Sequence, residues 1–326
     1  MSRKATTTGV VCLLTLSLWL NGCSVLQKQD LPHPYSFDER PIAWDGADAT
    51  SGYTELFAKD LCVVMDEHAF AGGEVSSEAA ALFSTGDQTV MYSKNAFERL
   101  YPASITKIMT ALVAIRYGNL EDKVTVTKDA VINESGATLC HIKPGDVLTL
   151  EQLLYGLMLP SGNDAGAAIA VHMAGSVEAF SDMMNQEAKR LAATGTHFMN
   201  PHGLTDEEHY TTAYDLYLIF NEALKYPKFR EITSTLTYVA NYTDGNGNPV
   251  SQTWDGGNWY MSGHRETPKG LTVFSGKTGT TQAAGYCLIM ASKDQEEKEY
   301  ISVILKAGSR PGLYDNMTNI IHKIVD

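Results

Sequence analysis

Cysteine is scarce in this sequence, and basic residues are outnumbered by acidic ones. Five cysteines in 326 residues are too few for a scaffold built on disulfides. The 25 lysines and arginines stand against 38 aspartates and glutamates, and the formal net charge of -13 argues against nucleic acid or an anionic lipid surface as the partner. No basic run follows the N-terminus, and no internal repeat or low-complexity run occurs. The composition, 44% hydrophobic and 19% charged, is typical of a globular protein.

The apolar run near the N-terminus is short. It extends from Gly9 to Leu20, follows the basic residues Arg3 and Lys4, and is too short for an ordinary membrane-spanning helix, so it predicts an export signal. The next residues, Leu20-Asn21-Gly22-Cys23, resemble a bacterial lipobox, in which cleavage before the cysteine leaves a lipid-modified N-terminus. The alternative is a plain signal peptide cleaved nearby.

The lipobox divides the chain into three parts. We expect a lipoprotein signal peptide at residues 1–22, a polar, proline-containing tether at 23–49 and one folded domain at 50–326. The protein would be exported and held at the outer face of the cytoplasmic membrane by a lipid on Cys23. If the lipobox is not used, the protein would be secreted.

Three thiols remain after this processing, because Cys12 leaves with the signal and Cys23 is acylated. The remaining Cys62, Cys140 and Cys287 are odd in number, so at least one is free or pairs between chains. Each lies in an apolar or strand-like stretch. We therefore expect these side chains to fill the core.

A serine and a lysine lie one helical turn apart near position 104. Pro102 is tolerated at a helix entry and Gly118 offers a stop, so a mostly buried helix is expected from Ser104 to Tyr117. Ser104 and Lys107 then lie on one face. A lysine desolvated in a pocket loses its preference for the charged form and can take the serine proton. The alternative is an N-cap serine beside a solvated lysine.

Two further motifs favour the catalytic interpretation. Ser161-Gly162-Asn163 follows an apolar helix and Pro160, and Lys277-Thr278-Gly279-Thr280 follows the strand-like stretch Leu271 to Phe274. The order S-x-x-K, S-x-N, K-T-G is the signature of active-site-serine penicillin-interacting enzymes.

The second motif is expected at a tight corner between two helices. Thr149 and Gln152 form a capping box that starts the first helix, and Pro160 ends it. Asp164 is expected to be the N-cap of an alanine-rich helix that runs to Gly175.

The remaining pattern predicts an α+β fold. Leu61 to Asp66 and Thr89 to Lys94 are expected to pair as a hairpin, with no role assigned to the stretch Gly72 to Gly86 between them. Three further strands and a closing helix follow near the C-terminus. Together they predict a five-stranded antiparallel sheet flanked by helices beside an all-helical lobe. The expected ranges are Leu271 to Thr278, Ala283 to Ser292 and Tyr300 to Lys306 for the strands, a helix through Leu313, Met317, Ile320, Ile321 and Ile324, and a short strand from Lys123 to Thr127.

Three of the nine histidines, His197, His202 and His209, cluster in the sequence and raise the alternative of a zinc site. Their spacings of five and seven do not fit one helical face, and no H-E-x-x-H occurs. We therefore expect neither a metal nor another cofactor.

Residues 50–326 resemble serine-type D-alanyl-D-alanine carboxypeptidases of the low-molecular-mass penicillin-binding protein family. Beyond the three motifs, the resemblance rests on Leu154 to Ala165, Thr196 to Phe198, Pro201 to Leu204 and Ala284 to Tyr286. One departure is that Ser275-Gly276 precede the K-T-G motif and Thr280 follows it. The resemblance implies a β-lactamase/transpeptidase-like fold.

The resemblance also implies roles for individual residues. Ser104 attacks the carbonyl between two D-Ala residues of a peptidoglycan stem peptide, Lys107 accepts its proton, and Ser161 relays a proton to the leaving amine. The backbone N–H groups of Ser104 and Thr280 would form the oxyanion hole. β-Lactams would acylate the same serine as inhibitors. The implied substrate-binding residues are Asn163, Lys277, Thr278, Gly279, Thr280 and Arg310; a solvated surface role is the alternative for Arg310.

Two other functions remain open at this point. A class A-like β-lactamase shares S-x-x-K and K-T-G, but it should have Asp where Gly162 stands and a Glu that activates the deacylating water. A lipid-anchored sensor domain would bind penicillin without turnover. Release of D-Ala from a peptide ending in Lys-D-Ala-D-Ala distinguishes the three functions.

Overall fold

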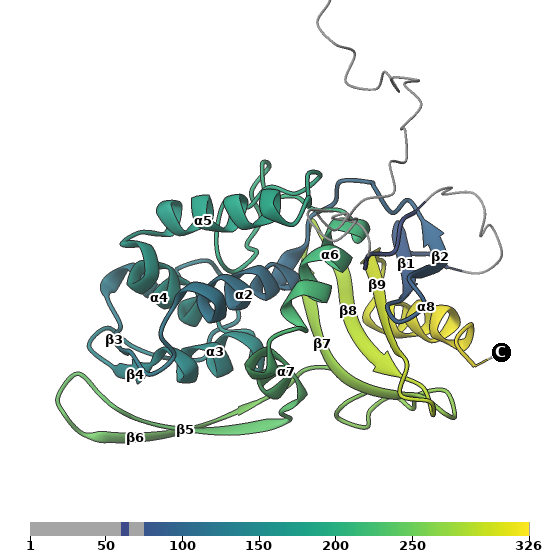
Figure 1. Ribbon diagram of the computed structural model, residues 1–326. Helices are drawn as coiled ribbons and strands as arrows, with labels where there is room; N and C mark the ends of the chain where they lie inside the picture. Colours follow the sequence, from purple (N-terminus) through teal and green to yellow (C-terminus); the bar gives the residue numbers. More distant parts are fainter. Residues whose placement is uncertain (1–59, 65–74, 326) are drawn as a thin grey trace, which may run out of the picture. The chain divides into compact units, whose positions relative to one another are not determined.

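The computed structural model describes residues 60–64 and 75–325 (Figure 1), all within the compact unit Glu55–Asp326. The predicted signal peptide, the tether and Cys23 lie outside the described residues. In the part of the chain that is described, no helix is long and apolar enough to cross a membrane.

A five-stranded antiparallel sheet forms one side of this unit. Its strand order is β2-β1-β9-β8-β7, and every neighbouring pair is antiparallel. The predicted sheet is therefore confirmed, and β7 lies at its edge. The strands are β1 Ala79–Ser84, β2 Thr89–Lys94, β7 Thr272–Thr281, β8 Gly285–Lys293 and β9 Glu299–Ala307.

Alternate residues of each strand point to opposite faces of this sheet, and both faces are buried. In β1, Ala80 and Leu82 pack with the C-terminal helix α8, Arg310–His322, whereas Ala81 and Phe83 belong to the larger core on the other face. Helix α6, Ala213–Ala223, covers that second face, and the ring of Phe83 stacks on Tyr217 at 4.1 Å.

The predicted pairing of Leu61 to Asp66 with β2 is wrong. The partner of β2 is β1, which lies within the stretch to which no role was assigned. Residues 61–64 form no strand, because tyrosines of α6 bind their backbone instead: Cys62 N–H donates to Tyr217 Oη at 2.9 Å, and Tyr214 Oη–H donates to Cys62 O at 2.9 Å.

From the sequence we expected the other lobe to be all-helical, and this prediction is wrong. It contains a second, four-stranded sheet with the order β3-β4-β5-β6. Its strands are β3 Lys123–Thr125, β4 Val147–Thr149, β5 Thr237–Thr243 and β6 Pro249–Asp255. The helices are α3 Leu150–Met158, α4 Asn163–Ala174, α5 Val177–Arg190 and α7 Pro227–Ser234, with a 3-10 turn η2 at Lys128–Ala130. The capping box of Thr149 and Gln152 at the start of α3 is confirmed.

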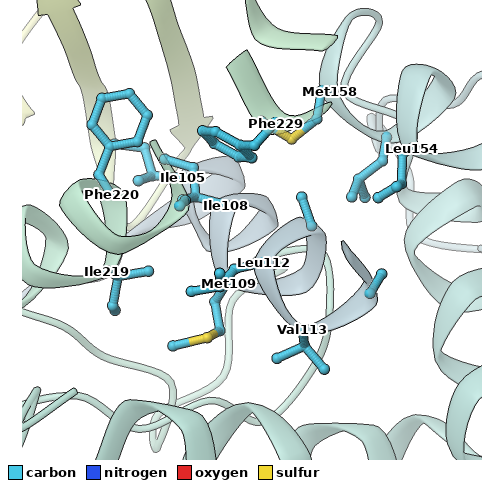
Figure 2. Packing of buried hydrophobic residues seen from close by; sticks show 14 of the residues in the cluster. Ile105, Ile108, Met109, Leu112, Val113, Leu154, Met158, Ile219, Phe220 and Phe229 are labelled. Atoms are coloured by element: carbon cyan, nitrogen blue, oxygen red, sulfur yellow. The ribbon is translucent and has the colours of Figure 1, made fainter. Parts of the chain in front are cut away.

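Helix α2, Lys107–Tyr117, lies at the centre of the larger core and follows directly on the 3-10 turn η1, Ala103–Thr106. Its eight residues from Lys107 to Ala114 are all buried. Figure 2 shows Ile108, Met109 and Leu112 surrounded by side chains of α3, α6 and α7. The helix that carries the S-x-x-K motif is thus held from several sides.

Candidate active site

Ser104 lies in the short turn η1 rather than in the α-helix that follows it. Ala103, just before it, has φ of 49°, in the left-handed region that a non-glycine residue rarely adopts. Strain of this kind persists only where the surroundings enforce it. The backbone that packs against Ala103 is that of Gly203, which has φ of +86°. The approach is so close that a Cβ at Gly203 would lie 1.8 Å from the carbonyl oxygen of Ala103.

Lys107 is fully buried, and its Nζ contacts three oxygens. Asn163 Oδ1 and His202 O each lie 2.7 Å away, and Ser104 Oγ lies 3.0 Å away. The first two are carbonyl oxygens, which only accept hydrogen bonds. A neutral amine has two N–H donors and one lone pair. If the two carbonyls take the donors, the lone pair of Lys107 faces the hydroxyl of Ser104.

The electrostatic surroundings favour this neutral amine. Burial is the largest effect and holds the pKa of Lys107 well below its ordinary value, and the positive charge of Lys277 lowers it further. The nearby Asp164 and Cys140 oppose the shift. Lys107 therefore has the position and the lowered pKa that acceptance of the Ser104 proton would require.

Ser161 and Asn163 lie at the predicted corner between α3 and α4. Ser161 has φ of 66°, and a Cβ at Gly162 would lie 2.8 Å from the carbonyl oxygen of Gly156. Asn163 N–H donates to Thr138 O at 2.9 Å. The corner is thus fixed by backbone contacts on both sides, and Asn163 is directed at Lys107.

The predicted N-cap role of Asp164 is wrong, because α4 begins at Asn163 with Gly162 as its N-cap. The carboxylate of Asp164 is buried and instead accepts backbone N–H groups of a neighbouring loop, from Cys140 at 2.9 Å and from Ile142 at 3.2 Å. It ties that loop to the corner.

The K-T-G motif lies on the edge strand β7 and faces the same corner. Lys277 is 3% exposed, and its Nζ donates to Ser161 Oγ at 3.0 Å and to Thr278 O at 3.1 Å. Burial lowers the pKa of Lys277 to about 7. Gly279 allows β7 to approach the serine, since a Cβ there would lie 2.9 Å from the backbone nitrogen of Ser104.

A cavity of about 510 Å³ opens in front of Ser104. Its walls are residues 134–138, Asn163, residues 202–205 and residues 280–283. Such a volume is typical of small-molecule sites. A second, much smaller pocket of about 20 Å³ is lined in part by Lys277 and Thr278, which do not line the large cavity.

Arg310 lies apart from these contacts. From the sequence we placed Arg310 on the loop after the last strand, but it is the first residue of α8. Its side chain is exposed, and its guanidinium carbon lies 5.9 Å from the ring centre of Trp259. The structure therefore brings together Ser104, Lys107, Ser161, Asn163 and Lys277, and it gives Arg310 a contact with an aromatic ring instead.

His209 supports the site and was not assigned this role from the sequence. Its Nδ1 accepts the N–H of Met199 at 3.1 Å, so the proton sits on Nε2 and is donated to Thr106 Oγ1 at 2.8 Å. Burial lowers the pKa of His209 to about 4, so the ring is neutral at pH 7. The signal available was the histidine-rich segment, which we had weighed only as a metal site.

Among residues 60–64 and 75–325, no three His, Cys, Asp or Glu side chains come together in a way that could hold a metal ion. Cys62, Cys140 and Cys287 are all free, and they are buried in the core as the sequence led us to expect. Burial raises the pKa of the Cys140 thiol well above its ordinary value, so this thiol is protonated beside the active site.

Residues 65–309 match the profile of a protein family described as D-alanyl-D-alanine carboxypeptidase. The D-alanyl-D-alanine carboxypeptidase DacF of Bacillus subtilis is 36% identical over 223 residues, which are 67% of this chain and 54% of that protein. A D-alanyl-D-alanine carboxypeptidase of Streptomyces sp. is 33% identical over 251 residues, 73% of this chain and 84% of that protein. This chain therefore spans about half the length of the Bacillus relative and most of the Streptomyces one.

Solved structures agree with these matches. The crystal structure of a Streptomyces DD-transpeptidase superposes with a TM-score of 0.71 at 32% identity, covering 78% of this chain and 98% of that one. A penicillin-binding protein homolog from Mycobacterium tuberculosis, 24% identical, superposes with a TM-score of 0.68 over 79% of this chain and 94% of its own. The expected transpeptidase-like fold is confirmed.

Proposed function

Because the chain belongs to the D-alanyl-D-alanine carboxypeptidase family, we propose that it removes the terminal D-Ala from peptidoglycan stem peptides through an acyl-enzyme on Ser104. The observation that carries the proposal is the 3.0 Å distance between Lys107 Nζ and Ser104 Oγ, with both N–H donors of a neutral amine engaged elsewhere. A lysine held in this way is a base for one hydroxyl.

In the first half of the reaction, Lys107 takes the proton of Ser104 as the oxygen attacks the carbonyl between the two D-Ala residues. The negative charge passes to the carbonyl oxygen, where the N–H groups of Ser104 and Thr280 would stabilise it; one such donor contributes about 3 kcal/mol in other enzymes. The close approach of Gly279 to the backbone of Ser104 supports this assignment.

The C–N bond then breaks, and D-Ala leaves as its amine gains a proton. Ser161, whose hydroxyl lies 3.0 Å from Lys277 Nζ, is assigned the relay of this proton. It gives its own proton to the amine and takes one in turn from the ammonium of Lys107, which leaves Lys107 neutral for the second half of the reaction. In the second half, water attacks the ester. Lys107 takes a proton from the water and returns it to Ser104, which releases the shortened peptide.

The C-terminal carboxylate of the substrate is assigned to Lys277 and Thr278. Lys277 is a buried cation below its pKa of about 7, and such a charge needs an anionic partner. Besides its contact with Lys107, Asn163 would hold the substrate amide. Arg310 could add a second positive charge only by leaving its contact with Trp259.

Outside the described residues, we propose that Cys23 carries a lipid that anchors the exported enzyme at the membrane. The proposal rests on the sequence Leu20-Asn21-Gly22-Cys23 after a short apolar run. Peptidoglycan lies outside the cytoplasmic membrane, so an anchor at this place keeps the enzyme near its substrate. β-Lactams, which carry a strained amide and a carboxylate, would acylate the same serine.

The test is release of D-Ala from Nα,Nε-diacetyl-Lys-D-Ala-D-Ala, together with mass spectrometry of the penicillin adduct. We expect catalytic release and an adduct on the peptide that contains Ser104, and loss of both in Ser104→Ala. Ser135→Ala is the matched control, since Ser135 lines the same cavity and should leave both intact. Penicillin hydrolysis without D-Ala release would show a β-lactamase, and a stable adduct without either turnover would show a sensor domain.

A further inference from the structure

One charged side chain stands in the wall of the cavity in front of Ser104. Among the described residues that line it, Glu134 alone carries a formal charge at neutral pH. His202, the only other ionisable side chain there, is neutral because burial and the nearby Lys107 lower its pKa to about 3. The cavity therefore presents a single negative charge to whatever enters it.

The Glu134 carboxylate is available to a ligand. The residue is exposed, and its side chain has no hydrogen-bond or ion-pair partner within residues 60–64 and 75–325. Its loop is nevertheless held in place: Ala137 N–H donates to Glu134 O at 3.1 Å, and Asn163 N–H donates to Thr138 O at 2.9 Å. These bonds fix the backbone of Glu134 relative to the active-site corner.

The direction of a bound peptide follows from the proposed function. Lys277 takes the terminal carboxylate and lines the small pocket, whereas the large cavity meets β7 only beyond the K-T-G motif, at Thr280 and Thr281. The peptide then crosses Ser104, so the residue before D-Ala-D-Ala enters the large cavity. Its side chain meets the wall that contains Glu134.

We propose that Glu134 determines substrate specificity by binding a side-chain ammonium on the residue that precedes D-Ala-D-Ala. This inference rests on the proposed function. A lone carboxylate attracts a cation, is indifferent to a neutral group and repels an anion. The preferred stem peptide therefore has a simple amine on that residue, as in lysine, and a side chain bearing an added carboxylate is disfavoured.

The test uses three peptides of the form Nα-acetyl-Lys-D-Ala-D-Ala, with the ε-amine free, acetylated or succinylated, so that its charge is positive, zero or negative. In the parent, kcat/KM should fall about two- to fivefold at each step, the size measured for exposed ion pairs, and the differences should shrink in high salt. In Glu134→Gln the three values should converge. Glu98→Gln, an exposed glutamate outside the cavity, should keep the parental order.

Equal kcat/KM for the three peptides in the parent, or an order that Glu134→Gln leaves unchanged, would overturn the inference while the carboxypeptidase function stands. If no peptide releases D-Ala, the proposed function fails. The same three end groups on the acyl side chain of a penicillin then decide the inference through the acylation rate of Ser104. Convergence of these rates in Glu134→Gln supports it, and rates independent of charge in the parent refute it.

Discussion

The amide oxygen of Asn163 lies 2.7 Å from Nζ of Lys107, and both side chains are buried. The contact joins the first and second motifs across 56 residues of sequence. It also decides which way the amine points, since an N–H directed at Asn163 cannot be directed at Ser104. We therefore infer that Asn163 positions Lys107, the proposed base, besides any contact with substrate.

Asn163→Asp should raise the pKa of Lys107, because a carboxylate beside a buried lysine stabilises the ammonium form. The protonated amine cannot accept the Ser104 proton. We expect the rising limb of the acylation rate against pH to move to higher pH, and at a given pH on that limb the rate should fall about tenfold for each unit by which the pKa of Lys107 rises. The measurement is acylation by a fluorescent penicillin from pH 5 to 10.

Asn241→Asp is the matched control for this prediction. Asn241 is exposed on β5, so the same change in charge far from Lys107 should leave the limb in place. A parental limb in Asn163→Asp would show that the contact with Asn163 does not govern the titration of the base.

Lys277→Gln should shift the same limb in the same direction for a different reason. The positive charge of Lys277 disfavours the ammonium form of Lys107 and so lowers its pKa. Removing that charge lets the pKa of Lys107 rise, and acylation then needs higher pH. Acylation is again followed across pH, in the parent and in the variant. A limb that stays or moves down would mean that Lys277 does not tune Lys107.

The alkaline side of the profile should report Lys277 itself. Burial puts its pKa at about 7, so above this pH the free enzyme loses the cation that binds the substrate carboxylate. We expect kcat/KM for Nα,Nε-diacetyl-Lys-D-Ala-D-Ala to fall above about pH 7. In the complex, the bound carboxylate raises the pKa of Lys277, so the fall in kcat should occur at higher pH.

The same peptide with an amidated C-terminus is the control for the alkaline limb. The amide has no carboxylate for the Lys277 cation to bind, so its kcat/KM should be lower at every pH and should not fall when Lys277 loses its charge near pH 7. An identical fall for the acid and the amide would assign the limb to a group other than Lys277.

The lipid anchor should depend on Cys23. In the expressing bacterium, Cys23→Ala should abolish incorporation of labelled palmitate and release the protein from the membrane fraction, because the residue that carries the lipid is then missing. One acyl chain alone anchors only marginally, so the parent should carry more than one. Cys12→Ala, in the same N-terminal segment, should leave both unchanged. Membrane association of Cys23→Ala equal to that of the parent would argue against the lipobox.

The sequence predicted the elements whose signals are local. The capping box of Thr149 and Gln152, the end of α4 at Gly175 and the strands β8 and β9 all depend on near neighbours, and the structure confirms them. The three motifs were recognised for the same reason. Their convergence around Ser104 followed from the resemblance, because sequence spacing alone does not fix the distances between Lys107, Asn163 and Lys277.

The errors arose where distant parts of the chain decide the structure. Cys62 and its neighbours have the composition of a strand, but tyrosines of α6 bind their backbone. Strand β1 was missed because its alanines give a weak strand signal, and the neighbouring β2 and β9 supply its pairing. By contrast, the β5–β6 hairpin had a readable turn at Asp244-Gly245-Asn246-Gly247-Asn248 and was overlooked.

Gly203 and Gly247 allow the role of the P-H-G-L segment to be tested with the backbone cost held constant. Both have φ of +86°, but a Cβ at Gly203 would lie 1.8 Å from Ala103 O, whereas a Cβ at Gly247 meets nothing within 4 Å. Each alanine variant pays for the left-handed conformation, about 1 to 2 kcal/mol. Only Gly203→Ala should also displace the turn that carries Ser104, so it should lose several-fold or more in acylation rate and more free energy of unfolding in urea than Gly247→Ala. Equal losses of stability with unchanged acylation would mean that Gly203 serves only its own loop.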